Sequence, residues 1–122
     1  MKTENHIVDK SFDFAVRIVN LCKYLQNDKK EYILSKQLIR CGTSIGANVN
    51  EAQAAQSTND FISKLSISSK EARESKYWLE LLTETDYLPK DHSKVIELKN
   101  QNLELIKLLT SIIKTTQEKN RR

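Results

Sequence analysis

The sequence predicts an all-α protein, an antiparallel up-down-up-down four-helix bundle in which residues 1–122 form a single domain. Glycine and proline together account for only three of the 122 residues, against a usual share of ~12%, which is too few for the regular turns of an all-β fold. Apolar residues recur instead at helical spacing in four long stretches. Because the breaks between these stretches are short, successive helices are expected to fold back against each other.

The first predicted helix spans residues 10–26 and has a broad apolar face. Its apolar residues fall on two adjoining stripes: Phe12, Val16, Val19 and Cys22 on one, and Phe14, Ile18, Leu21 and Leu25 on the other. A helix on the surface of a globular protein needs only one such stripe. After the break at residues 27–30, Asp28 and Glu31 have the spacing of a capping box for the next helix.

The second predicted helix spans residues 29–56 and carries two glycines beside its apolar seam. The seam residues are spaced alternately four and three apart: Leu34, Leu38, Cys41, Ile45, Asn48 and Ala52. Gly42 and Gly46 each cost the helix roughly 1 kcal/mol relative to alanine. We interpret them as points where a neighbouring helix approaches closely, with a local kink as the alternative.

The third and fourth predicted helices span residues 59–86 and 91–118. Ser57 or Thr58 is expected to cap the third helix, with Asp60 in its first turn, where the helix dipole favours an anion. The segment 86–89 ends in a proline, which disfavours a helical conformation in the residue before it and so terminates the helix. Residues 119–122 are expected to form a frayed, basic tail.

The predicted helices carry more apolar surface than one subunit can bury. A bundle of helices this long is slender, and apolar residues on two stripes of several helices exceed what a single interior can hide. We therefore expect copies of the chain to associate with one another.

Polar residues interrupt the apolar pattern at regular intervals on the second helix. They recur at spacings of three and four and so share one face: Gln37, Arg40, Ser44, Asn48 and Glu51. On the third helix Glu71 and Glu74 lie between apolar positions, where a half-buried carboxylate stays ionised only if it is paired or hydrogen-bonded. Arg40 is the expected partner, with Ser44 and Asn48 as further donors. We interpret the group as a structural polar network that sets helix register or the geometry of the oligomer; a ligand or metal pocket inside the bundle is the alternative.

Catalytic motifs are sparse in this sequence. It contains no Glu-x-x-His pair for a di-iron bundle, no glycine-rich phosphate loop and no nucleophile elbow. Cys22 and Cys41 lack a metal-binding or redox spacing and are interpreted as packed thiols. Glu71 and Glu74 resemble half of the Mg²⁺ site of all-α nucleotide pyrophosphohydrolases, with Glu97 as the nearest third carboxylate. The main prediction is a non-enzymatic protein without cofactors, and the alternative is an Mg²⁺-dependent pyrophosphohydrolase.

The charge pattern and the hydropathy bear on partners and location. The chain has a net charge of +4, and a basic cluster near its C-terminus, Lys114, Lys119, Arg121 and Arg122, is a candidate contact for nucleic acid. No apolar run approaches the ~18 residues of a transmembrane helix, and the first residues lack the apolar stretch of a signal peptide. We expect a cytoplasmic protein without a membrane partner.

The segment QLIRCGTSIGANVNE, residues 37–51, resembles the signature of a bacterial family of four-helix-bundle proteins first noticed in intervening sequences of large-subunit rRNA genes. Its members typically read Gln-x-x-Arg and then Ser-Ile-x-x-Asn-Ile-x-Glu-Gly, which corresponds here to Gln37, Arg40, Ser44, Ile45, Asn48, Val49 and Glu51. The family pattern continues at Asp60, Phe61, Leu65 and Glu74, so that the resemblance covers roughly residues 9–115. Ala52 replaces the usual glycine, and Glu71 replaces a common serine.

This resemblance implies a four-helix bundle that assembles as a homo-oligomeric ring, usually a pentamer, and it implies no catalytic activity. Related bundle proteins act as accessory factors of diversity-generating retroelements, in which a basic barrel binds nucleic acid and a reverse transcriptase. The implied role is therefore an accessory or scaffold factor that associates with RNA or DNA or with a nucleic-acid enzyme. Few aromatic side chains are expected to remain free to stack on bases, because most of the eight occupy core-type positions.

Overall fold

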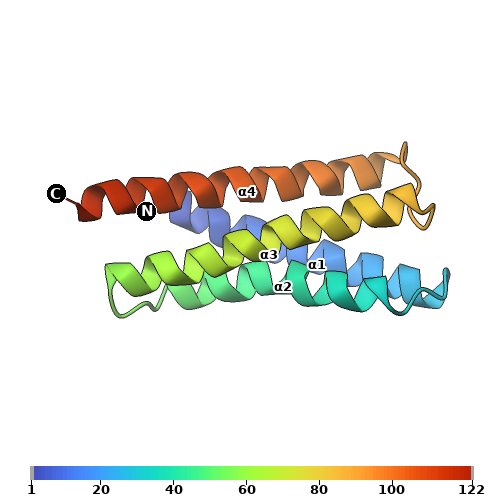
Figure 1. Cartoon of the computed structure of the whole chain (residues 1–122), viewed down its shortest axis with the longest axis horizontal. Coiled ribbons are helices and arrows are strands. Elements are labelled where there is room, and N and C mark those ends of the chain that lie inside the picture. Colours follow the sequence, from blue (N-terminus) through green and yellow to red (C-terminus); the bar gives the residue numbers. More distant parts are fainter. Residues whose placement is uncertain (1, 122) are drawn as a thin grey trace.

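In the computed structural model, which describes residues 2–121, the chain forms four helices: α1 (Lys2–Asn27), α2 (Leu34–Ala52), α3 (Thr58–Glu84) and α4 (Ser93–Asn120). Consecutive helices run in opposite directions, so that the first turn of α1 and the last turn of α4 lie at the same end of the bundle (Figure 1). There are no strands among the described residues. The observed architecture is the predicted all-α, antiparallel four-helix bundle.

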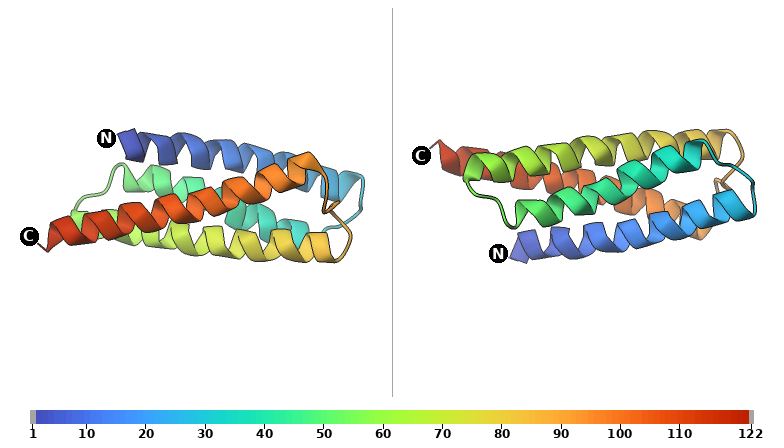
Figure 2. Two further views of the ribbon diagram at one scale, coloured as in Figure 1. Left: turned by 90° about the horizontal axis from the view of Figure 1, so that it is seen from above. Right: turned by 90° about the horizontal axis from the view of Figure 1, so that it is seen from below.

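The helices are arranged in chain order around the bundle axis. Each packs against two neighbours, α1 against α2, α2 against α3, α3 against α4 and α4 against α1, and within the described residues the backbones of diagonally opposed helices stay apart. Figure 2 shows that α4 runs obliquely, with its first turns beside α1 and its last turns beside α3. Ion pairs join α1 to α4 on the bundle surface, from Arg17 to Glu97 (2.7 Å) and from Lys10 to Glu104 (3.1 Å).

The first helix begins well before the predicted residue 10. The reason is that its buried face continues toward the N-terminus, where Ile7 is only 1% exposed. Of the two predicted apolar stripes, one has Phe14, Ile18 and Leu25 fully buried and Leu21 partly buried. The other stripe faces outward in part, with Phe12 70% exposed and Val16 44% exposed. Phe12 and Val16 are therefore part of the apolar surface that the sequence predicts to exceed what one subunit buries.

The second helix begins at Leu34 instead of residue 29, because α1 continues to Asn27 and the chain then turns at Lys30, which has a left-handed backbone. Lys30 has a φ of 56°, and the N–H of Glu31 donates to the carbonyl oxygen of Leu25 (2.9 Å), which closes the turn after α1. The carboxylate of Glu31 then accepts hydrogen bonds from three backbone N–H groups at the start of α2 (2.7–3.1 Å). The predicted capping box led by Asp28 is wrong, since Glu31 itself caps the helix.

The charge of Glu31 is held against the N-terminus of α2. Burial would raise the pKa of Glu31, which is 7% exposed, but the hydrogen bonds from the three backbone N–H groups outweigh burial and lower it. The carboxylate is therefore ionised at neutral pH, where it also complements the dipole of α2.

The remaining helix boundaries follow local capping. The second helix ends at Ala52 instead of residue 56. The hydroxyl of Ser57, one of the two predicted caps, accepts a hydrogen bond from the N–H of Asp60 (3.0 Å), and α3 starts at the next residue. The fourth helix includes Lys119 and Asn120, so that it extends past its predicted end at residue 118.

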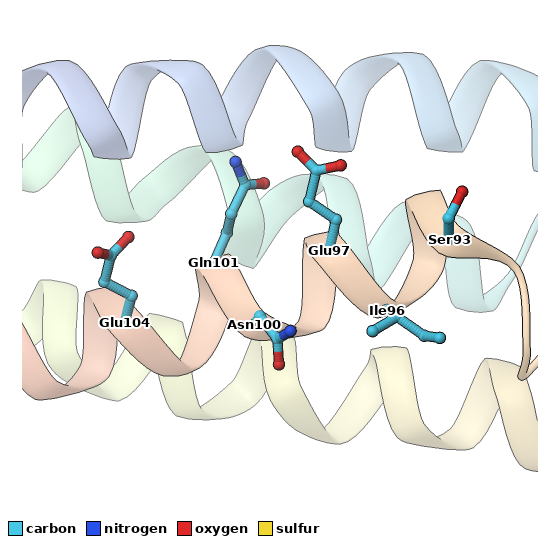
Figure 3. A pocket seen from close by; sticks show the side chains of 6 residues that line it. All are labelled: Ser93, Ile96, Glu97, Asn100, Gln101 and Glu104. Atoms are coloured by element: carbon cyan, nitrogen blue, oxygen red, sulfur yellow. The ribbon is translucent and has the colours of Figure 1, made fainter.

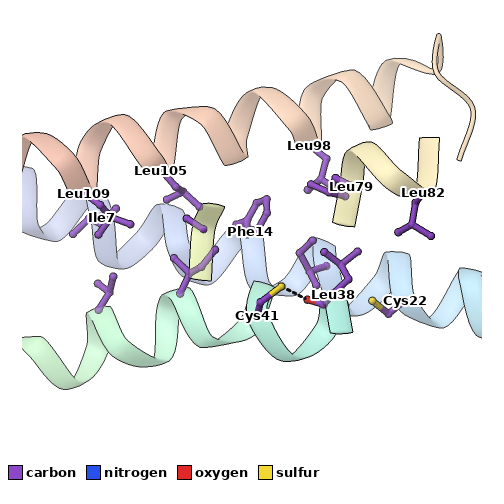
Figure 4. Packing of buried hydrophobic residues seen from close by; sticks show 14 of the residues in the cluster. Ile7, Phe14, Cys22, Leu38, Cys41, Leu79, Leu82, Leu98, Leu105 and Leu109 are labelled. Atoms are coloured by element: carbon purple, nitrogen blue, oxygen red, sulfur yellow. Dashed lines mark hydrogen bonds between the residues drawn. The ribbon is translucent and has the colours of Figure 1, made fainter. Parts of the chain in front are cut away.

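Apolar side chains from all four helices meet in one continuous core (Figure 4). Polar side chains also make hydrogen bonds between helices inside this core, among them Ser68 and Asn102. The Ser68 hydroxyl on α3 donates to the carbonyl oxygen of Ile45 on α2 (2.8 Å), and the Asn102 amide on α4 donates to the carbonyl oxygen of Ala72 on α3 (3.0 Å). These hydrogen bonds link α3 to both of its neighbours. They also set its register, because each joins one defined pair of residues.

The glycines of α2 lie where α1 comes closest. A Cβ atom added to Gly42 would lie 2.8 Å from Cγ2 of Ile18, and one added to Gly46 would lie 3.2 Å from the carbonyl oxygen of Ser11. The first distance is too short for any real Cβ contact, so the absence of a side chain at Gly42 permits the close packing of α1 against α2. The helix continues without interruption through both glycines.

None of the helices described in residues 2–121 is both long enough and apolar enough to cross a membrane.

Candidate functional site

The polar residues singled out in the sequence form a three-membered charged cluster between α2 and α3. Arg40 on α2 extends to both carboxylates of α3, with 3.1 Å between Nη1 and Oε2 of Glu71 and a second contact from Nη2 to Oε2 of Glu74. The indole N–H of Trp78 donates to the same oxygen of Glu74 (3.0 Å). One guanidinium therefore bridges two carboxylates that are three residues apart on one helix.

The hydrogen bonds keep this cluster ionised. The Trp78 indole and the Arg40 guanidinium lower the pKa of Glu74, and the hydrogen bond to Glu74 raises the pKa of Arg40. The Arg40 side chain is half exposed, whereas that of Glu71 is 17% exposed. An ion pair so open to water contributes about 0–1 kcal/mol to stability. The cluster therefore acts through the geometry it imposes on α2 and α3 more than through its energy.

The other members of the polar stripe do not reach the carboxylates. The Ser44 hydroxyl donates to the carbonyl oxygen of Arg40 (2.7 Å), and the Asn48 amide donates to the carbonyl oxygen of Ser44 (2.9 Å). The expectation that Ser44 and Asn48 supply further donors to Glu71 and Glu74 is wrong, because both side chains bond within their own helix. Gln37 and Glu51 are exposed at the two ends of the stripe.

The three carboxylates of the pyrophosphohydrolase alternative do not come together. Glu97 accepts a hydrogen bond from Arg17 of α1 (2.7 Å), on the α1–α4 side of the bundle, and Glu71 and Glu74 are held by Arg40 on the α2–α3 side. No group of three His, Cys, Asp or Glu side chains within the described residues is placed to hold a metal ion. The arrangement of these residues thus gives no support to a shared Mg²⁺ site.

Glu97 also lines a shallow hollow along α4 (Figure 3). All the lining residues come from this one helix: Ser93, Ile96, Glu97, Asn100, Gln101 and Glu104. Glu97 and Gln101 point toward α1, whereas Ile96 and Asn100 point away from it (Figure 3). A hollow walled by one helix does not enclose a small molecule, since ligand pockets bury most of their ligand.

The basic residues near the C-terminus do not form one compact cluster. Lys114 and Lys119 are five residues apart on α4, so that their side chains leave the helix about 140° apart. Lys119 lies at a second hollow between α4 and the start of α3, whose floor includes Phe61 and Ile112. Arg121 is exposed, and Arg122 lies outside the described residues.

The two cysteines are packed thiols. Burial raises the pKa of Cys22 to about 12 and also raises the pKa of Cys41. The Cys22 thiol donates to the carbonyl oxygen of Ser35 (3.4 Å), and the Ser75 hydroxyl donates to the sulfur of Cys41 (3.3 Å). Neither thiol is ionised at neutral pH, and thiolates are the reactive form.

Sequence reasoning missed two features of the bundle. Asn102 is 1% exposed, and its amide oxygen has no hydrogen-bond partner among the described residues. The sequence could have indicated that Asn102 is buried, because this polar residue lies between Leu98 and Leu105 on an apolar seam. The second feature is the Glu31 carboxylate, which caps α2. The spacing of Asp28 and Glu31 had predicted that Asp28 leads a capping box and that the helix begins at residue 29 instead of Leu34.

Comparison with known proteins agrees with the resemblance noted at residues 37–51. The family model of the 23S rRNA-intervening sequence proteins matches residues 3–111. A crystal structure of a protein with unknown function from the S23 ribosomal protein family of Bacteroides thetaiotaomicron VPI-5482 is similar, with 54% sequence identity and a TM-score of 0.88. The alignment covers 92% of this chain and 98% of that chain. No protein with a curated description shows significant similarity. Over nearly its whole length, the chain therefore belongs to the 23S rRNA-intervening sequence protein family.

Proposed function

We propose that this protein is a non-enzymatic, homo-oligomeric bundle, a ring of five copies, that serves in the cytoplasm as an accessory or scaffold factor. Its partner is RNA or DNA, either directly or through a nucleic-acid enzyme. The observation that carries this proposal is the outward-facing apolar stripe of α1, where Phe12 is 70% exposed and Val16, one turn later, is 44% exposed.

The exposed stripe supports association between copies of the chain. Phe12 and Val16 are four residues apart and lie on the same side of α1. A phenylalanine left in water forgoes the roughly 1.5–3 kcal/mol that full burial of a large apolar side chain provides. A second copy that covers the stripe recovers that energy, and the four helices leave no other described segment of the chain to cover it.

Charge supports nucleic acid as the partner. Each copy has a net charge of +4, so that a ring of five carries about +20. Basic proteins attract the phosphate backbone without sequence preference, and the attraction weakens steeply with salt. Association adds the fields of the copies together, which strengthens this attraction at low ionic strength.

Sedimentation equilibrium at micromolar protein tests the association. We expect a mass several times the 14.1 kDa of one chain, and a smaller mass when Phe12→Ser and Val16→Ser are combined. Tyr77→Ser is the matched control, because Tyr77 is 59% exposed on α3. A well-folded wild-type particle with the mass of one chain would contradict the oligomeric part of the proposal.

Fluorescence anisotropy with labelled RNA and DNA oligonucleotides tests the partner. We expect binding at 50 mM salt that weakens as salt increases. The absence of binding to both nucleic acids at low salt would exclude direct contact. A role through a nucleic-acid enzyme would then require that the protein co-purify with such an enzyme at a fixed ratio, and failure of this second test would remove the proposal.

A further inference from the structure

The turn between α1 and α2 lies at the end of the bundle far from the chain termini (Figure 1), and basic and aromatic residues gather there in the sequence. The Cys22 thiol and the Gln26 amide both donate to Ser35 (3.4 and 3.2 Å), so that the last turns of α1 lie against the first turn of α2. Four lysines border or occupy this region, and all are exposed: Lys23, Lys29, Lys30 and Lys36.

The positive charge of this turn is not cancelled locally. None of the four lysines takes part in an ion pair between the described side chains. Of the two carboxylates in the turn, that of Glu31 is buried and accepts hydrogen bonds from the start of α2. Asp28 is the one exposed carboxylate within residues 28–33. The outward charge of the region is therefore positive.

Two aromatic rings are accessible beside these lysines. Tyr32, in the segment between the two helices, is 49% exposed, and Tyr24, in the last turns of α1, is 38% exposed. The expectation that most of the eight aromatic residues are occupied in the core is wrong, because four of them are exposed: Phe12, Tyr24, Tyr32 and Tyr77. An accessible ring can stack on an unpaired base, and neighbouring lysines can contact the phosphates of the same strand. Duplex recognition fits less well, because a duplex keeps its bases stacked on each other.

We propose that the α1–α2 turn is a contact surface for single-stranded RNA or DNA, in which Lys23, Lys29, Lys30 and Lys36 meet phosphates and Tyr32 stacks on a base. This inference rests on the proposed association with nucleic acid and assigns it to a surface other than the C-terminal lysines. The ring of Tyr32 and the flexible lysine side chains suit a strand of any sequence.

The test is the salt dependence of anisotropy with labelled oligouridylate and oligothymidylate of 20 nucleotides. The charge variant combines Lys29→Ala with Lys30→Gly, since glycine keeps the left-handed backbone at residue 30. For single strands the slope of log K against log salt is about −0.7 per neutralised phosphate, so the double variant is expected to reduce its magnitude by about 1.4. Tyr32→Ala is expected to weaken binding about 5- to 150-fold.

Matched controls separate this surface from alternatives. Lys114→Ala combined with Lys119→Ala removes the same charge from α4 and should leave the slope unchanged, and helical circular dichroism checks that every variant is folded. Wild-type binding that persists unchanged in the turn variants but weakens in the α4 variant overturns this inference and leaves the proposed function standing. A wild type that binds neither oligonucleotide overturns this inference and also the direct contact in the proposed function, whose indirect form is then decided by co-purification with a nucleic-acid enzyme. Phosphatidylserine vesicles form a further arm: if the turn variants lose vesicle binding but keep nucleic-acid binding, the surface is a lipid contact and the inference is wrong.

Discussion

The substitution Gly42→Ala tests whether close packing of α1 against α2 explains the glycine. In a helix that faced only water, alanine at this position would stabilise the protein by about 1 kcal/mol. Here the added Cβ would lie 2.8 and 3.0 Å from the two γ-carbons of Ile18 and 3.3 Å from its Cβ. Ile18 is fully buried and β-branched in a helix, so that it has no alternative rotamer to adopt. Overpacking of this kind costs typically 1–3 kcal/mol, and we expect a net destabilisation of about 1 kcal/mol.

Urea denaturation at one fixed protein concentration, followed by Trp78 fluorescence and circular dichroism, measures this change, because association makes stability depend on concentration. Ala47→Gly, at an exposed position of the same helix, calibrates the helix propensity alone and should cost about 1 kcal/mol. In the Ile18→Ala background, Gly42→Ala should instead stabilise by about 1 kcal/mol, which gives a coupling energy of about 2 kcal/mol. If Gly42→Ala stabilises the wild type and shows no coupling to residue 18, close approach is not the reason for the glycine.

Three further substitutions or treatments test the local chemistry. Glu31→Gln should destabilise the protein at pH 7 by about 1–2 kcal/mol, since the amide has one acceptor oxygen for three N–H groups. Because folding lowers the pKa of Glu31, the stability that its carboxylate contributes is present above the pKa of the unfolded state and is lost as pH falls through the pKa of the folded state. Urea titrations of wild type and variant should therefore converge in acid. A difference in stability that persists at pH 2 would contradict this. Lys30→Gly should stabilise by about 1 kcal/mol, because φ is 56° at residue 30, and an unchanged denaturation midpoint would count against the left-handed backbone there. Cys22 and Cys41 should resist a thiol-specific chromogenic reagent at pH 8 in native protein and react fully in urea, since burial raises both pKa values; fast reaction in the native state would show that the thiols are accessible.

Periodicity and composition were sufficient to predict the number of helices, their order and their antiparallel arrangement. Arg40 and its two carboxylates were also predictable, because Glu71 and Glu74 are three residues apart on one helix and face the same neighbour. The hydrogen bonds of Ser44 and Asn48 were not, since their short side chains find a carbonyl oxygen of their own helix nearer than any carboxylate of α3.

The sequence by itself determined that the chain has four helical segments, that Ser57 or Thr58 caps the third, and that α1 has a broad apolar character, because these depend on residue spacing and local hydrogen bonds alone. The tertiary structure decided that Phe14 is buried and Phe12 is exposed, and that Asn102 spans the core to α3. Each of these depends on which neighbouring helix covers a given side chain. A stripe of apolar residues determines only the direction in which a side chain leaves its own helix. The packing of the other three helices determines whether that side chain meets the core or water.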